Sequence, residues 1–225
     1  MKLTHFVVIV LTSTALSAQN AKPAQTQPAT QCGPLAGQVL RCPRFSFTYK
    51  VPYGWVDRTS EMSEEAQPEA APTGNNDQAA KPGGKSQPEA SSSGSETLLA
   101  VFERPPGAPG DTIDSAAIIA AEPLANYHGI KTAADYFGAI TELAEQRGFK
   151  AIGDPYTFSI GAKQLVRGDF SKPRNKLTMY QTSLAMIEKG YIVSFTFIGG
   201  REDEVDELIA NLNLGTRRAS HAGSK

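Results

Sequence analysis

The sequence predicts an α+β domain in which helices flank a twisted antiparallel sheet of about six strands. Strand-like alternation of apolar and polar residues recurs along the chain, whereas the spacing of an amphipathic helix is clear only at 132–147 and 202–212. Short turns connect the strand patterns of the second half, and such turns join antiparallel neighbours. Together these observations predict one layered domain.

The chain begins with the layout of a secretory signal peptide, which we predict to be residues 1–18. Lys2 gives a positive start, an apolar run follows, and small residues surround the cleavage that we expect after Ala18. The alternative is a membrane anchor, but a spanning helix needs roughly 20 predominantly apolar residues and this run is shorter. We therefore expect an exported protein, periplasmic or extracellular, without stable membrane insertion after cleavage.

The two cysteines, Cys32 and Cys42, lie in the segment 19–44, which otherwise has the composition of a flexible leader. Glycine and proline between them are turn residues that allow the two ends to approach. Reduced, unrelated thiols are the alternative, but disulfides persist in the compartments that exported proteins reach. A structural zinc site needs four ligands and no histidine is near, so we expect a disulfide and no metal.

One domain is expected at 45–215, with a disordered insertion at 60–96 and a polar tail at 216–225. The insertion is rich in Pro, Gly, Ser and Gln, and it cannot bury enough apolar surface to offset the entropy of ordering it. It is also acidic, which suits either a tail that binds a basic partner or a solvated loop; we favour the loop. The net charge of −1 leaves no nucleic-acid footprint.

The elements follow from local patterns. Aromatic residues alternate with polar ones over 45–51 until Pro52 ends the run, which indicates a strand. Further strands are expected at 98–103 and 115–122 on either side of a Pro-rich turn. In the second half, the predicted strands are 156–160, 163–170, 177–187 and 191–198, with a tight hairpin turn at 188–190.

Two helices complete the prediction. Thr132 and Asp135 resemble a capping box at the start of the helix 132–147, and Gly148 suits the left-handed conformation just beyond its end. The closing helix, 202–212, begins with acidic residues, which favour the positive end of a helix dipole.

The order of these elements resembles that of PsbP-like domains. The pattern Phe-x-Phe-x-Tyr-x-Val-Pro-x-Gly-Trp at 45–55 is similar to the start of that family, as are the strand 115–122, the helix 132–147 and the closing segment 177–212. The resemblance implies a Mog-type α/β/α sandwich and a non-catalytic domain that acts through protein contacts. The family offers no catalytic residues to carry over, and the insertion at 60–96 departs from its pattern.

The candidate ligand-binding residues are Tyr53, Trp55, His128 and Arg167. Tyr53 and Trp55 can stack on a ligand, although a tryptophan after Pro-x-Gly more often anchors the core. His128 is the one histidine away from the chain ends, but a triad needs a nucleophile beside it and no Gly-x-Ser-x-Gly motif is present.

Asp169 and Glu188 are the candidate carboxylate pair for glycoside hydrolysis, and surface charge is the better interpretation of both.

We expect no catalytic residues and no cofactor. The sequence thus favours an exported, non-enzymatic binding or scaffolding domain whose partner is another envelope protein. A small-ligand-binding periplasmic protein is the alternative, and an unrecognised hydrolase comes third. A deep polar pocket at His128 or Arg167 favours the ligand binder, and a flat apolar patch favours a protein partner.

Overall fold

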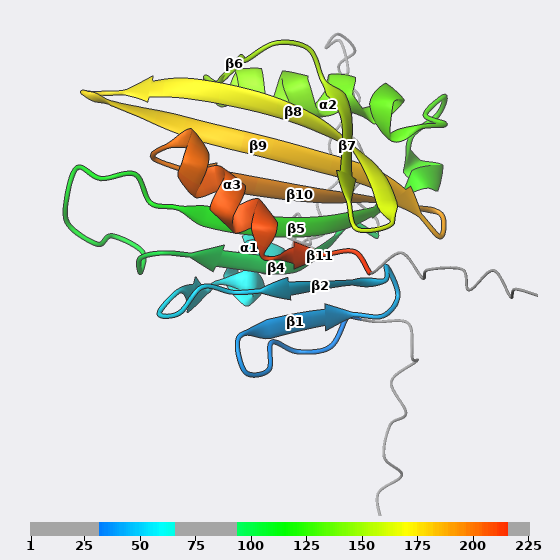
Figure 1. Ribbon diagram of the computed structural model, residues 1–225, viewed down its shortest axis with the longest axis horizontal. Coiled ribbons are helices and arrows are strands. Elements are labelled where there is room, and N and C mark those ends of the chain that lie inside the picture. Colours follow the sequence, from blue (N-terminus) through cyan, green and yellow to red (C-terminus); the bar gives the residue numbers. More distant parts are fainter. Residues whose placement is uncertain (1–31, 66–93, 216–225) are drawn as a thin grey trace, which may run out of the picture.

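A computed structural model of the chain describes residues 32–65 and 94–215 (Figure 1). The predicted signal peptide 1–18 and the predicted tail 216–225 lie outside the described residues. The two described ranges belong to one fold, because Val56 in the first pairs with Phe102 in the second.

The strands form two antiparallel sheets rather than one sheet of about six strands (Figure 1). The larger sheet has eight strands in the order β3-β4-β5-β10-β9-β8-β6, and β7 also pairs with β8; the smaller has the order β1-β2-β11. The α+β class is confirmed, and the predicted strand number was wrong. The larger sheet contains β3 (Val56–Asp57), β4 (Glu96–Phe102), β5 (Ala116–Pro123), β6 (Lys150–Ala151), β7 (Tyr156–Ile160), β8 (Lys163–Arg174), β9 (Leu177–Glu188) and β10 (Tyr191–Gly199).

The smaller sheet corrects the described part of the predicted flexible leader 19–44, of which residues 19–31 lie outside the described residues. Its strands are β1 (Val39–Cys42), β2 (Phe47–Lys50) and β11 (Leu212–Asn213). Leu40 pairs with Tyr49 across β1 and β2, and both side chains are buried. The folded domain therefore includes β1 and the Cys32–Cys42 disulfide, and the predicted boundary at residue 45 was wrong.

The predicted disordered insertion at 60–96 is wrong at both of its ends. Residues 59–65 form the helix α1 (Thr59–Glu65), and Glu96 is the first residue of β4. The Thr59 hydroxyl accepts a hydrogen bond from the backbone N–H of Ala100 at 2.9 Å, which fastens α1 to β4. The rest of the predicted insertion, 66–93, lies outside the described residues.

The first long helix, α2 (Ala133–Gln146), begins and ends as the sequence predicts. Thr132 is its N-cap, and the complete capping box with Asp135 is present. At the other end Gly148 has a φ of 83°, and the Phe149 N–H donates to the Ala144 carbonyl at 3.0 Å. This is the hydrogen bond of a Schellman cap, so the helix stops where glycine allows the chain to reverse.

The closing hairpin follows the sequence, and the closing helix starts at the predicted residue but ends two residues before the predicted 212. The helix α3 (Glu202–Ala210) stops before Leu212, which is buried in β11. Lys189 and Gly190 connect β9 to β10 with φ values of 49° and 79°. Two consecutive residues with positive φ match the type I′ turn, whose twist suits a hairpin.

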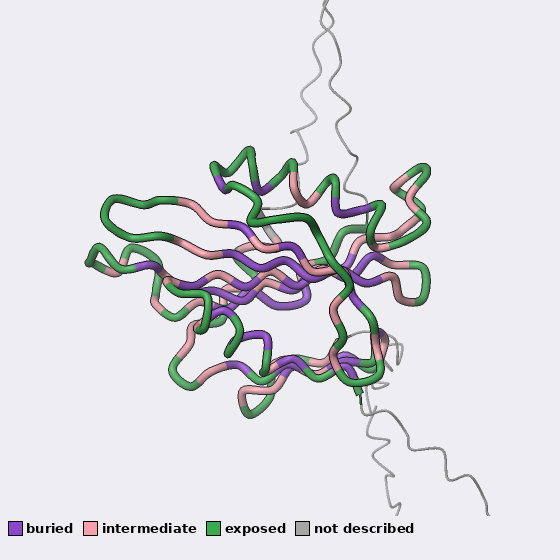
Figure 2. Tube along the Cα trace, turned by 45° about the horizontal axis from the view of Figure 1, so that its top comes forward, coloured by how far each residue is buried: buried purple, intermediate pink, exposed green. Residues whose placement is uncertain are grey.

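The larger sheet separates two hydrophobic clusters, and the buried positions gather along its centre (Figure 2). On one face α2 packs directly against β8, where a Cβ on Gly168 would lie 2.5 Å from the Phe137 ring. On the other face the main cluster is covered by α3 and by the smaller sheet. Side chains of β8 and β9 on this face therefore lie close to α3, although α3 comes later in the chain.

The main cluster contains one unsatisfied hydroxyl. Tyr49 is 0% exposed, and its hydroxyl has no hydrogen-bond partner among the described residues. An unpaired buried polar group costs roughly 1–3 kcal/mol. We expect Tyr49→Phe to raise the free energy of unfolding by about 1 kcal/mol, because the ring keeps its packing against Phe197. Urea unfolding measures this, with Tyr49→Leu as the destabilised control; a less stable Phe variant would mean that the hydroxyl has a partner.

Candidate functional site

The sequence-predicted site residues do not form one group. Tyr53 is 92% exposed, and Trp55 is partly buried against the main hydrophobic cluster on the side of the smaller sheet. His128 is exposed and follows the short helix η1 (Leu124–Asn126), next to Tyr127, which packs on the α2 side. The larger sheet thus separates His128 from the two aromatic residues.

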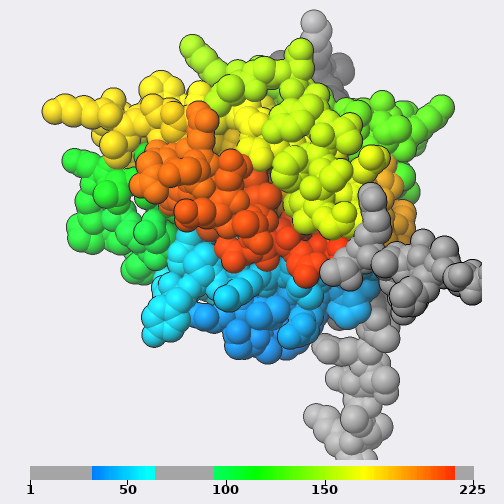
Figure 3. All heavy atoms as spheres, viewed as in Figure 1, coloured from blue at the N-terminus to red at the C-terminus, as the bar shows by residue number. Residues whose placement is uncertain are grey.

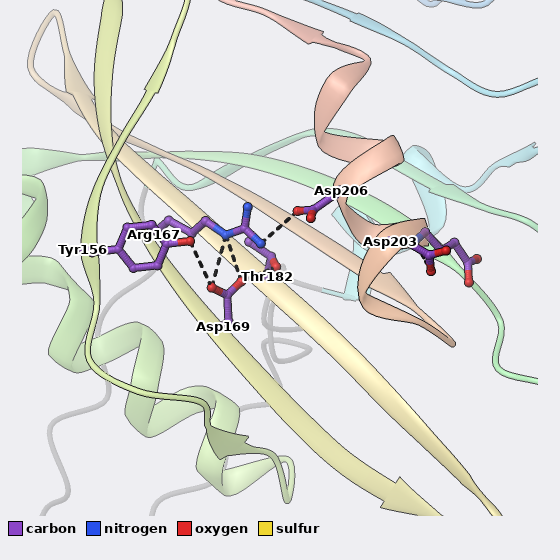
Figure 4. A network of polar contacts seen from close by, with 7 residues as sticks. Tyr156, Arg167, Asp169, Thr182, Asp203 and Asp206 are labelled. Atoms are coloured by element: carbon purple, nitrogen blue, oxygen red, sulfur yellow. Dashed lines mark hydrogen bonds and ion pairs between the residues drawn. The ribbon is translucent and has the colours of Figure 1, made fainter.

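Arg167 is the sequence-predicted residue around which polar side chains converge. Its side chain is only 14% exposed, and it lies on the face of β8 that looks toward α3. Its Nε donates to both carboxylate oxygens of Asp169 at 2.9 and 3.2 Å, and its Nη2 lies 2.9 Å from an oxygen of Asp206 in α3 (Figure 4). The Phe158 ring packs against the guanidinium at 5.2 Å.

Asp169 receives further hydrogen bonds because of the strand register. Thr182 lies opposite Asp169 in β9, and its hydroxyl donates to the carboxylate at 2.6 Å. Tyr156 lies opposite Arg167 in β7, and its hydroxyl donates to Asp169 at 3.4 Å. Side chains from β7, β8, β9 and α3 therefore form one connected network (Figure 4).

The surroundings of Arg167 and Tyr156 raise the pKa of both groups. Burial alone lowers the pKa of Arg167, but the hydrogen bonds and charges of Asp169 and Asp206 outweigh it and raise the pKa. Burial raises the pKa of Tyr156, and the nearby Asp169 adds to this while Arg167 opposes it. Both groups keep their protons at neutral pH.

Two hollows meet at the Arg167–Asp206 ion pair. One is a pocket of about 120 Å³ between α3 and the sheet, lined by Ile152, Arg167, Asp169, Phe170, Tyr180, Gln181, Thr182, Glu202, Val205 and Asp206. The other, which we call the β7–α3 groove, is an open hollow of about 490 Å³ lined by Phe158, Ser159, Ile160, Gly161, Arg167, Asp206, Ile209, Ala210 and Leu212. Figure 3 shows α3 and the neighbouring β7 region side by side on this face of the molecule.

Sequence reasoning missed most of this network. The sequence favours surface charge for Asp169, but its side chain is 21% exposed and lies at the centre of the network. The spacing Arg167-x-Asp169 was an available signal, because residues two apart in a strand share a face. Glu188 is separate from it, since its carboxylate pairs with Lys163 at 2.7 Å.

A second polar cluster lies on the α2 side of the sheet. The carboxylate of Glu122 accepts hydrogen bonds from the hydroxyls of Tyr127 and, at 3.1 Å, Tyr136. The two tyrosine rings pack edge to face with centroids 5.1 Å apart. Burial raises the pKa of Glu122, and the hydrogen bond from Tyr136 offsets part of that rise. This cluster ties η1 and α2 to the end of β5, so we interpret it as structural.

The raised pKa of Glu122 predicts a pH dependence of stability. The folded state binds this proton more tightly than the unfolded state, so the group favours folding at low pH and this contribution is lost as pH rises through the folded pKa. We expect Glu122→Gln, which keeps an acceptor for the tyrosines, to be more stable than the natural protein at pH 7. The difference should shrink toward pH 4. Thermal unfolding at both pH values measures it, and an advantage that grows on acidification would contradict the sign.

None of the described helices is long and apolar enough to span a membrane. The described residues also contain no group of three or more His, Cys, Asp or Glu side chains arranged to hold a metal ion.

No protein-family model matches the sequence, and no curated protein does. Among solved structures, the chain is similar to cyanobacterial PsbP (CyanoP) from Synechocystis sp. PCC 6803, with 10% identity over 84% of this chain and 100% of that one and a TM-score of 0.45. It is similar to LpqN of Mycobacterium tuberculosis, described as involved in cell envelope biogenesis, with 14% identity, 73% and 76% coverage and a TM-score of 0.34. It is also similar to PA94 of Pseudomonas aeruginosa, a protein of unknown function, with 19% identity, 46% and 71% coverage and a TM-score of 0.33.

One of these structures is a PsbP protein, the family that the sequence pattern resembles. Because all three TM-scores lie below 0.5, we base no functional inference on these likenesses. The Mog-type α/β/α sandwich stays a prediction.

Proposed function

We propose that this protein is an exported, non-enzymatic binding domain that holds another envelope protein in the β7–α3 groove. The observation that carries the proposal is the open groove of about 490 Å³ with the Arg167–Asp206 ion pair at its boundary. Apolar side chains line much of the groove, among them Phe158 and Ile160, and the charged Arg167 and Asp206 line it as well. Apolar contact area bounded by polar groups is the usual composition of a protein interface.

The sizes of the two hollows favour a protein partner over a small ligand. Small-molecule sites are typically enclosed and measure about 300–1,000 Å³. The pocket beside Asp169 is much smaller, about 120 Å³. The groove is large enough, but it is open to solvent, which suits a segment of a larger molecule.

The chemistry of the network supports a binding role. Catalytic acids and bases usually have a pKa near the operating pH. In the network, the pKa values of Arg167 and Tyr156 are shifted away from neutrality, and Asp169 is held by several hydrogen bonds. These hydrogen-bonded side chains therefore hold the wall of the groove in a fixed geometry.

Two features support export. The first residues have the layout of a signal peptide, and the Cys32–Cys42 disulfide is of a kind that persists in oxidising compartments. We expect the mature chain to start at Gln19, and N-terminal sequencing of the protein from the cell envelope fraction tests this. A mature chain that retains Met1 would overturn export by this route.

The binding role is tested by site-specific photo-crosslinking in living cells. A benzophenone amino acid replaces Ser159 in the groove, and a control replaces Ala139, which is exposed on α2 across the sheet. We expect one envelope protein to crosslink from position 159 and not from 139. Ala210→Lys, which puts a charge at an exposed position of the groove, should abolish that product. Equal crosslinking from both positions, or none from either, would contradict the proposal.

A further inference from the structure

The β7 strand has an open edge at the groove. It pairs with β8 along its whole length, and among residues 32–65 and 94–215 no strand pairs with its other side. Figure 1 shows the end of β7 facing α3, and residues 158–161 together line the groove between them. Unpaired backbone N–H and C=O groups of such an edge can bond to an added strand.

The composition of β7 leaves this edge unprotected as far as Ile160, and the backbone of Gly215 lies against Gly161 just beyond the strand. Natural edge strands are commonly blunted by charged residues, proline or a covering loop. Residues 156–160 read Tyr-Thr-Phe-Ser-Ile, with neither charge nor proline. The outer edge of β1 is treated differently, because its own disulfide loop covers it: Gly33 donates to the Arg41 carbonyl at 2.9 Å, and Ala36 and Val39 bond to each other.

We propose that the partner binds by strand addition, an extended segment of it pairing with β7 in the groove. This inference rests on the proposed function, since it uses the same groove. Recognition of this kind gains affinity from backbone hydrogen bonds and specificity from pockets for alternate side chains. Here, alternate side chains of the segment enter the apolar part of the groove, against the partly buried Phe158 and Ile160.

The charge of α3 defines the chemistry of the segment. Glu202, Asp203, Asp206 and Glu207 are exposed on this helix, and Arg201 pairs with Asp203. Asp206 is the one of these four that lines the groove, and together with Asp169 it outnumbers the single positive charge of Arg167. A segment in which Lys or Arg alternates with apolar residues therefore complements the groove. A second copy of this chain fits less well, because its β7 carries no basic residue.

The test uses the full chain and synthetic heptapeptides, measured by isothermal titration calorimetry. We expect alternating Lys and Val to bind and alternating Glu and Val not to bind. Two N-methylated versions of the Lys–Val peptide are compared, one methylated at the odd residues and one at the even residues, so that each lacks the backbone donors of one strand edge. The version that lacks the donors facing β7 should bind roughly tenfold more weakly or worse. If neither phase of methylation changes the affinity, strand addition is overturned while binding in the groove stands.

The location is tested with charge variants. Asp206→Lys should weaken the Lys–Val peptide about 3- to 10-fold, whereas Glu145→Lys, an equal charge change on the exposed side of α2, should leave it unchanged. Equal effects of the two variants would overturn the site. Crosslinking from Ser159 without any binding of the basic peptide would overturn the basic strand chemistry and leave the proposed function in place. If the protein forms a dimer and the peptide dissociates it, the partner is a second copy of this chain and the proposed partner is overturned.

Discussion

Removal of the Cys32–Cys42 disulfide is expected to lower the free energy of unfolding by about 3 kcal/mol. In the chain-entropy model, a bridge stabilises a protein by restricting the unfolded chain, and a loop closed over a sequence separation of 10 residues gives a value of this size. The effect is a large fraction of the roughly 5–15 kcal/mol by which domains are stable.

The position of the bridge adds a local effect to this global one. Cys42 is buried at the end of β1, and the loop that the bridge closes supplies the hydrogen bonds to the outer edge of that strand. When the bridge is lost, these bonds must be held by the loop alone. We therefore expect the amides of Gly33, Ala36 and Val39, which donate these bonds, to exchange faster than the amides in the strands of the larger sheet.

The measurement is urea unfolding of the Cys32→Ala/Cys42→Ala double variant, with alanine chosen because it adds no polar atom to the core. The natural protein unfolded in the presence of a reducing agent is the control, since it loses the bridge without losing either side chain. The two should agree to within about 1 kcal/mol. A loss well below 1 kcal/mol in both would show that the loop is held by its other contacts.

The helices and strands that the sequence predicts correctly are those long enough to show a periodic pattern of apolar and polar residues. The helix at 133–146 is indicated by Thr132 and Asp135 at one end and Gly148 at the other, and β9 and β10 by long alternation and a tight turn. The missed strands β3, β6 and β11 have two residues each, and their pairing partners define them. β1 was missed because four residues beside turn-forming glycines show too little alternation.

The polar network shows why a site is harder to predict than an element. Arg167 and Asp169 are close in sequence, but Thr182 reaches Asp169 only through the register of β8 and β9. Asp206 arrives from a helix that follows those strands, and its position depends on how α3 packs. Contacts of this kind come from tertiary packing, which single-sequence patterns do not specify.

Replacement of Arg167 by methionine is expected to lower the free energy of unfolding by about 2–3 kcal/mol. Methionine retains the apolar stem that packs on Phe158 but removes the charge. The partly buried Asp169 is then left with a hydroxyl from Thr182 and a long hydrogen bond from Tyr156. Breaking a buried ion pair on one side costs about 3–5 kcal/mol, and the partial exposure here reduces that figure.

The chain provides a matched control for this change. Arg201 pairs with Asp203 at the same 2.9 Å separation, but their side chains are 69% and 70% exposed. Exposed ion pairs contribute about 0–1 kcal/mol, so Arg201→Met should have little effect on stability. Urea unfolding of both variants compares the same chemical change in two degrees of burial, and equal losses would contradict a special role for the network.

A double-mutant cycle then separates the charge pair from the packing around it. If the cost of Arg167→Met comes from leaving the Asp169 carboxylate unpaired, adding Asp169→Asn removes that cost and restores part of the stability. The coupling between the two substitutions should be about 1–2 kcal/mol. If the losses simply add, the Arg167–Asp169 ion pair does not account for the cost of Arg167→Met, and the pair serves the groove rather than the fold. The cycle uses Asp169 because Asp206 is 59% exposed and contributes little to stability by itself. Its result therefore decides whether the charge of the buried arginine stabilises the fold or only shapes the groove.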